Sequence, residues 1–140
     1  MGYEIRSLQG VGAIDFGMSP LEVRGLIKAK FKSFKRSSKA TYPCDYFPSV
    51  GVFAYYKASG ELEALEFALP AQPVFEGKDL LGMGFDAAKI LLLSKDPALE
   101  IEVDGAISRS LGISLYAPLA KDDPAGNCES ILVFEQGYYD

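Results

Sequence analysis

The sequence predicts an α+β fold in which helices pack on one face of an antiparallel β-sheet, and three recurring segments indicate a tandem repeat. The segments recur in the same order along the chain. They pair residues 16–19 with 81–84, residues 50–55 with 111–116, and residues 65–67 with 132–134. Each copy joins an apolar helical stretch to strands with short turns, a pattern typical of a helix followed by an antiparallel meander.

Length and composition predict one domain, residues 1–140, made of two repeats at about 1–70 and 71–140. A chain of 140 residues, 49% of them hydrophobic, can bury one core. A unit of about 70 residues is only marginally stable alone, so we expect the two units to share a sheet or to pack together. A doubled unit of this kind presents a continuous surface, which favours binding over catalysis in a cleft.

The first helix is expected to begin at Ser19 and to fade near Lys30. The Ser19 hydroxyl can accept a hydrogen bond from the first helical turn, Pro20 suits the first helical position, and Glu22 can complete a capping box. The second helix is expected over residues 85–94, where four consecutive apolar residues indicate deep burial.

Strands rich in aromatic and β-branched residues follow each helix. In the first unit they are expected over residues 41–47, 50–56 and 61–69, the last two joined by a turn at 57–60. In the second unit they are expected over residues 99–103, 106–107, 111–116 and 130–135, with a hairpin turn at Asp104-Gly105.

The net charge of −5 is unevenly distributed along the chain. Residues 1–39 carry eight Lys and Arg against three acids, a net charge of +5, whereas residues 40–140 carry six against sixteen, a net charge of −10. The acidic part repels nucleic acid and attracts basic proteins, although plain solubility also explains acidity. The basic residues at 28–39, interleaved with Phe31 and Phe34, could form a nucleic-acid strip. We favour a strand with one solvated face there and expect no nucleic-acid partner.

The residue types argue against catalysis, cofactors and metals. The chain has no histidine, which removes the most frequent general base and the usual catalytic zinc ligands. Cys44 and Cys128 lack the spacing of a zinc site and are expected to be reduced apolar fillers. The sequence shows neither a secretory signal nor an apolar run long enough to cross a membrane. We therefore expect a cytoplasmic, non-enzymatic protein; the oligomeric state is not indicated.

Adjacent tyrosines and paired acids are the candidate partner-binding residues. Tyrosine is a frequent interface anchor, and strand alternation should direct one ring of each adjacent pair outward. Acids at the start of a strand and in the polar loop at 121–127 can attract a basic partner, although such acids usually form only a solvated face. The predicted set is Tyr55, Tyr56, Glu61, Glu63, Asp122, Asp123, Tyr138, Tyr139 and Asp140.

The segment at 16–23, Phe-Gly-Met-Ser-Pro-Leu-Glu-Val, resembles the Gly-Met-Ser/Thr-x-x-x-Val helix start of small outer-membrane-assembly lipoproteins. It also resembles the β-lactamase inhibitor protein family, whose fold is a tandem repeat of a helical segment and an antiparallel sheet. In size, acidity and fold type, the chain looks like small immunity proteins encoded beside secreted bacterial toxins. These resemblances imply a tandem-repeat fold and a protein partner.

The leading functional hypothesis is an immunity protein that neutralises a secreted bacterial toxin by occluding its active site with an acidic, tyrosine-rich sheet. The partner is then expected to be a basic toxin domain. A regulatory or structural domain that binds another cellular protein is the alternative. An enzyme that uses carboxylates alone is a third hypothesis.

Overall fold

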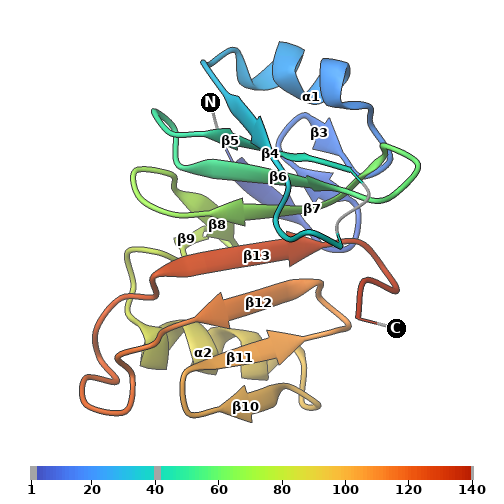
Figure 1. Cartoon of the computed structure of the whole chain (residues 1–140). Helices are drawn as coiled ribbons and strands as arrows, with labels where there is room; N and C mark the ends of the chain where they lie inside the picture. Colours follow the sequence, from blue (N-terminus) through green and yellow to red (C-terminus); the bar gives the residue numbers. More distant parts are fainter. Residues whose placement is uncertain (1–2, 40–41, 140) are drawn as a thin grey trace.

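The computed structural model describes residues 3–39 and 42–139, which form two helices and two β-sheets (Figure 1). The helices are α1 (Pro20–Ile27) and α2 (Phe85–Lys95). The larger sheet has eight strands in the order β10 (Glu100–Glu102), β11 (Gly105–Ser108), β12 (Ile113–Tyr116), β13 (Ser130–Phe134), β7 (Leu62–Phe67), β6 (Val52–Tyr56), β5 (Cys44–Phe47) and β4 (Lys32–Phe34). All of its neighbouring strands are antiparallel. The class is therefore α+β, as predicted.

The smaller sheet lies behind β6 and β7 in Figure 1 and is built from the segments that precede the two helices. Its five strands run in the order β3 (Ile14–Asp15), β2 (Gly10–Val11), β1 (Tyr3–Arg6), β8 (Pro73–Phe75) and β9 (Lys78–Asp79). The pairing of β1 with β8 is parallel and joins segments from the two halves of the chain. The two halves therefore share both sheets.

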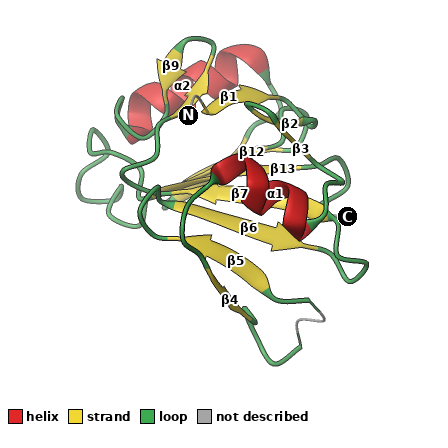
Figure 2. Ribbon diagram, turned by 90° about the horizontal axis from the view of Figure 1, so that it is seen from above, coloured by secondary structure: helices red, strands yellow, loops and turns green. Residues whose placement is uncertain are grey.

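The larger sheet separates two hydrophobic clusters of different size. The larger cluster, which we call the main core, includes Phe47, Leu65 and Ile113 and joins residues of both sheets and both helices. Figure 2 shows the smaller sheet lying over one face of the larger sheet. The smaller cluster lies on the opposite face of the larger sheet and contains Tyr55 and Phe134. Strand alternation explains the division, because successive side chains of a strand point to opposite faces.

Helix α1 begins with the capping box predicted from the sequence. The Glu22 amide donates a hydrogen bond to Ser19 Oγ at 3.2 Å, and the Ser19 amide donates one to Glu22 Oε1 at 3.1 Å. The helix ends at Ile27, because Lys28 adopts a left-handed conformation with φ 56°. Val23 and Ile27 anchor it in the main core.

Replacing Ser19 by Ala is expected to lower the free energy of unfolding by about 1 kcal/mol, because an amide of the first turn loses its side-chain acceptor. Urea denaturation of the wild type and the variant measures the change. A Ser19→Thr variant keeps an acceptor and is the matched control. Equal midpoints for Ser19→Ala and the wild type would show that the capping box contributes nothing to stability.

Helix α2 begins without a side-chain cap, at Gly84. Its first amides donate instead to backbone oxygens of the β12–β13 loop, from Phe85 to Gly126 O at 2.8 Å and from Asp86 to Pro124 O at 3.0 Å. The start of this helix therefore depends on a tertiary contact, whereas α1 carries its own cap. In Figure 1, α2 lies behind β11 and β12.

Candidate protein-binding surface

The outer face is the face of the larger sheet that points away from the main core and toward the viewer of Figure 1. The strand registers show which side chains lie on this face. Alternate residues of each strand point to it, and the residues with which they pair on the neighbouring strands point to the same face. The central ones are Phe34, Cys44, Tyr46, Phe53, Tyr55, Ala64, Glu66, Ile107, Ser114, Tyr116, Leu132 and Phe134.

Aromatic rings dominate the half of the outer face formed by β4, β5 and β6. The rings of Tyr46 and Phe53 are stacked with centroids 4.1 Å apart, and Phe53 also stacks with Tyr55 at 6.2 Å. Phe34, on the edge strand, is 43% exposed. On the other half, Tyr116 is 44% exposed. Large rings that are held by neighbours and still reach solvent are characteristic of protein interfaces.

The segment after β13 folds back over the outer face. Tyr138 and Tyr139 contact the ring of Phe134, with centroids 5.5 Å and 5.0 Å away. The Arg36 guanidinium lies 3.9 Å from the centre of the Tyr55 ring and donates a 3.5 Å hydrogen bond to the Tyr138 hydroxyl. Tyr138 and Tyr139 therefore belong to this face, and Tyr139 is 39% exposed. Asp140 lies outside the described residues.

Tyr55 points outward, as strand alternation predicts for one ring of the Tyr55-Tyr56 pair, but the ring does not reach solvent. The two rings do point to opposite faces, but both are buried. Tyr55 lies on the outer face beneath Arg36, and its hydroxyl donates to the Glu66 carboxylate. Burial and this carboxylate raise the pKa of the Tyr55 hydroxyl far above its ordinary value. Alternation sets only the direction of a side chain; its exposure depends on what else packs there.

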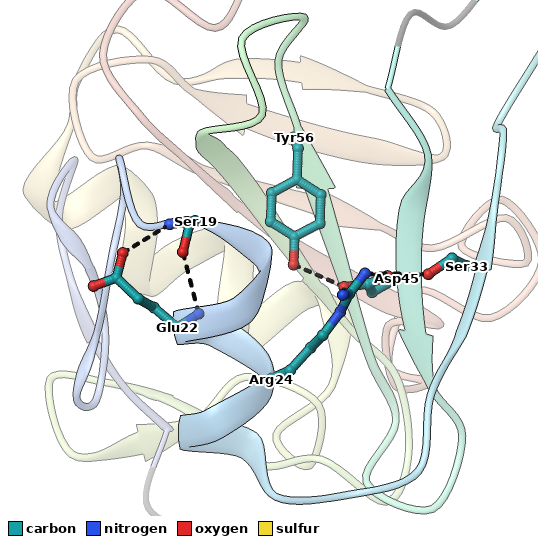
Figure 3. A network of polar contacts seen from close by, with 6 residues as sticks. All are labelled: Ser19, Glu22, Arg24, Ser33, Asp45 and Tyr56. Carbon is teal, nitrogen blue, oxygen red and sulfur yellow. Dashed lines mark hydrogen bonds and ion pairs between the residues drawn. The ribbon is translucent and has the colours of Figure 1, made fainter.

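Tyr56 points the other way and joins a buried polar network centred on Asp45 (Figure 3). Arg24 of α1 donates to both carboxylate oxygens of Asp45, at 2.8 Å and 3.0 Å. Ser33 of β4 and Tyr56 of β6 donate through their hydroxyls at 2.6 Å and 3.0 Å. One fully buried carboxylate thereby links a helix to three strands.

The pKa of Asp45 is lowered despite its burial. Burial alone would raise the pKa, but the hydrogen bonds from Arg24, Ser33 and Tyr56 favour the ionised form and outweigh it. Burial, followed by the charge of the same carboxylate, raises the pKa of the Tyr56 hydroxyl. Asp45 is therefore held ionised with donors from α1, β4 and β6 in place, an arrangement that stabilises the fold.

Glu61 lies directly before β7, and Glu63 is the second residue of that strand. Glu61 is exposed and accepts a hydrogen bond from the Ser59 hydroxyl at 2.9 Å. Glu63 is half-buried beside Tyr138, and burial followed by the charge of Glu135 raises its pKa. Lys57 forms an ion pair with Glu135 at 3.0 Å. The structure thus brings Glu63 next to the tyrosine segment.

Asp122 and Asp123 lie at a different place, in the loop between β12 and β13. This loop leads into the start of β13, whereas Tyr138 follows the end of that strand, and Figure 1 shows the two at opposite sides of the sheet. Both aspartates are exposed. Of the predicted residues, Glu63 and Tyr138 therefore lie together, Asp122 and Asp123 lie in the loop that caps α2, and Tyr56 lies in the core.

The two cysteines are free, as predicted, and they are buried, whereas half-burial was expected. Cys44 belongs to the cluster of the outer face and Cys128 to the main core, so they lie on opposite faces of the larger sheet. Burial raises the pKa of both thiols, and that of Cys128 reaches about 11.

Several outer-face residues were not selected from the sequence, namely Phe34, Tyr46, Phe53 and Tyr116. The sequence does place aromatic residues at these positions of the expected strands. In the structure, Tyr46 and Phe53 pair across β5 and β6. Sequence alternation shows that two such rings share a face, but not which face a helix or a second sheet covers.

In the described residues, no group of three or more Cys, Asp or Glu side chains is arranged to hold a metal ion. Among the same residues, neither helix has the length and apolar character needed to cross a lipid bilayer. Comparison with protein families, curated proteins and solved structures finds no match to this chain.

Proposed function

We propose that this chain is a protein-binding protein whose outer face holds its partner. The observation that carries the proposal is the group of partly exposed aromatic rings on one continuous face, from Phe34 through the Tyr46–Phe53 stack to Tyr116. Rings fixed by stacking lose little conformational entropy on binding. These rings are spread over strands from β4 to β12, an extent that suits a protein better than a small molecule.

The most concrete form of this function is an immunity protein that acts in the cytoplasm and occludes the active site of a secreted bacterial toxin. The net charge of −5 favours a basic partner. Glu66, Glu100 and Glu102 place carboxylates on the outer face itself, beside the aromatic rings. Long-range attraction would raise the association rate, and the rings would slow dissociation.

A tandem duplication is our account of how the continuous face arose, with both helices covering the opposite face. Support comes from the strand order of the larger sheet, which is symmetric about its centre. Counted outward from the β7–β13 pair, β7, β6, β5 and β4 of the first half occupy the same places as β13, β12, β11 and β10 of the second half. Leu65 and Leu132 point to opposite faces of this sheet, so the match of residues 65–67 with 132–134 shifts by one residue.

Backbone conformations at corresponding positions also support duplication. Gly51 and Gly112 precede β6 and β12, have φ of 70° and 69°, and donate to the last residues of β5 and β11, Phe47 and Ser108. Gly17 and Gly82 each lie two residues before a helix N-cap. Their conformations differ, since only Gly17 has a positive φ, of 97°.

The experiment that tests the function captures the partner and then asks which face holds it. The tagged chain is incubated with lysate of its native host, bound proteins are identified by mass spectrometry, and the purified partner is used for binding kinetics. Tyr116→Ala and Phe34→Ala are each expected to raise the dissociation rate about tenfold, as loss of an interface anchor does. Leu21→Ala is the matched control, because Leu21 is a large apolar residue, 78% exposed, on α1.

The salt dependence of association and the activity of the captured partner then distinguish an immunity protein from a regulatory domain. The association rate should fall steeply as salt rises, since charges are screened beyond about 10 Å at 0.1 M, and Glu61→Lys should lower it further. Loss of the partner's toxic activity in the complex supports immunity, whereas a non-toxic cellular partner supports a regulatory domain. Equal dissociation rates for the ring variants and Leu21→Ala would reject the outer face as the binding site.

A further inference from the structure

We propose that copies of this chain associate edge to edge, with β4 of one copy pairing with β10 of the next to extend the larger sheet. The two strands are the opposite edges of that sheet, and all three residues of each are exposed. This interface lies along the two edges of the sheet, where it borders the outer face, and it goes beyond the proposed function.

The two edges carry opposite charge. Six Lys and Arg residues and no acid occupy residues 28–39, which include β4. Three acids and no base occupy residues 100–104, which include β10. Like edges repel each other, so pairing of β4 with β4 or β10 with β10 is disfavoured. Charge therefore selects the pairing of unlike edges.

In the extended sheet, the charged side chains of β4 and β10 would lie on the same face. Lys32 pairs with Tyr46 and points to the outer face, and so do Glu100 and Glu102, through their pairs with Ile107 and Gly105. A copy placed beside the first without being turned over therefore brings Lys32 alongside Glu102 and Glu100. Arg109 already forms an ion pair with Glu100 at 2.7 Å, so Glu102 is the main partner expected for Lys32. Opposite charges on neighbouring strands of one face attract each other.

Apolar residues meet on the other face of the same junction. Ile101, 51% exposed, pairs with Ala106 of the main core and so points to the core side. Phe31 is 40% exposed and contacts Phe47 of the main core, so its ring also lies on that side. Pairing of β4 with β10 would bring these two half-exposed side chains together and remove apolar surface from water.

Strand direction also permits the pairing. The eight strands alternate in direction, so β4 runs opposite to β10 within one copy. A second copy in the same orientation then presents β10 antiparallel to β4. Such a contact joins different surfaces of the two copies and can repeat from copy to copy.

Reciprocal charge reversals test this interface by sedimentation velocity over a range of protein concentrations. The wild type should show a sedimentation coefficient that rises with concentration at about 0.01 M salt and much less at about 1 M, where the Debye length is about 3 Å. Lys32→Glu alone and Glu102→Lys alone should each abolish most of that rise. Lys121→Glu, a reversal at an exposed loop residue, is the matched control and should behave as the wild type.

An equimolar mixture of Lys32→Glu and Glu102→Lys should restore association, because each variant supplies the edge that the other requires. Retention of the rise by either variant alone, or its loss in Lys121→Glu, would place the contact elsewhere. A wild type that sediments as a monomer at every concentration and salt would reject the proposal. The sedimentation experiment contains no partner, so a monomeric wild type would leave the proposed function standing. Equal partner dissociation rates for the ring variants and Leu21→Ala would reject the proposed function without affecting assembly.

Discussion

Replacing Asp45 by Ala is expected to lower the free energy of unfolding by about 3 kcal/mol or more, as loss of one partner in a buried ionic network does. The Tyr56 hydroxyl would remain buried without its acceptor, and Arg24 would lose both of its bonds to the carboxylate. The Arg24 side chain is 31% exposed and can regain water, which keeps the loss near the lower end of this range. Urea denaturation monitored by tyrosine fluorescence measures it.

Asp15→Ala is the matched control for this prediction. Asp15 also pairs with an arginine, Arg6 at 2.6 Å, but its side chain is 56% exposed. Exposed ion pairs contribute about 1 kcal/mol or less. Similar losses for the two variants would contradict the assignment of Asp45 as the centre of a stabilising network.

The contribution of Asp45 should also depend on pH. Because folding lowers the pKa of this carboxyl, its stabilisation is present in full above the unfolded value of about 3.9 and is lost as the pH falls toward the folded value. Asp45→Asn removes the charge but keeps the shape of the side chain. The stability difference between the wild type and Asp45→Asn should therefore shrink as the pH is lowered below about 4. A constant difference would show that the charge is not responsible.

Gly51→Ala is expected to lower the free energy of unfolding by more than about 2 kcal/mol. The left-handed conformation with φ 70° costs an alanine about 1 kcal/mol, and a Cβ at this position would lie 2.1 Å from the Ala68 carbonyl oxygen. That oxygen belongs to backbone that cannot move without disturbing the sheet. Gly112→Ala should be similarly destabilising, since its Cβ would lie 2.6 Å from the Phe134 carbonyl oxygen.

Gly25→Ala is the control for the glycine variants and should raise the free energy of unfolding instead of lowering it. Gly25 lies inside α1, and its Cβ would meet nothing within 4 Å. Alanine favours the helix over glycine by about 0.8–1 kcal/mol, so thermal denaturation should show a higher midpoint. A neutral Gly51→Ala variant would show that the loop before β6 can rearrange, and would remove one argument for equivalent loops in the two halves.

Local features of the fold could be predicted because short-range chemistry determines them. Ser19 and Glu22 form their capping box within one helical turn. The turn at 57–60 joins β6 and β7, and Asp104-Gly105 joins β10 and β11. In each case the groups that interact are close in sequence, so residue types and spacing suffice.

Contacts between residues that are distant in the chain could not be predicted from the sequence. The parallel pairing of β1 with β8 joins strands from different halves, and the cap of α2 comes from the β12–β13 loop. The residues that flank β1, β8 and the start of α2 in the sequence give no indication of these pairings. Asp45, likewise, could be recognised as a buried carboxylate only once Arg24, Ser33 and Tyr56 had been brought around it.

For the candidate surface, the sequence alone determined that the strands are aromatic and alternate, so that Tyr55 and Tyr56 point to opposite faces. Only the tertiary structure decided which rings reach solvent: Arg36 covers Tyr55, the Asp45 network encloses Tyr56, and Tyr116 stays exposed. The physical reason is that side-chain direction follows from the backbone of one strand, whereas exposure depends on every segment that packs above it.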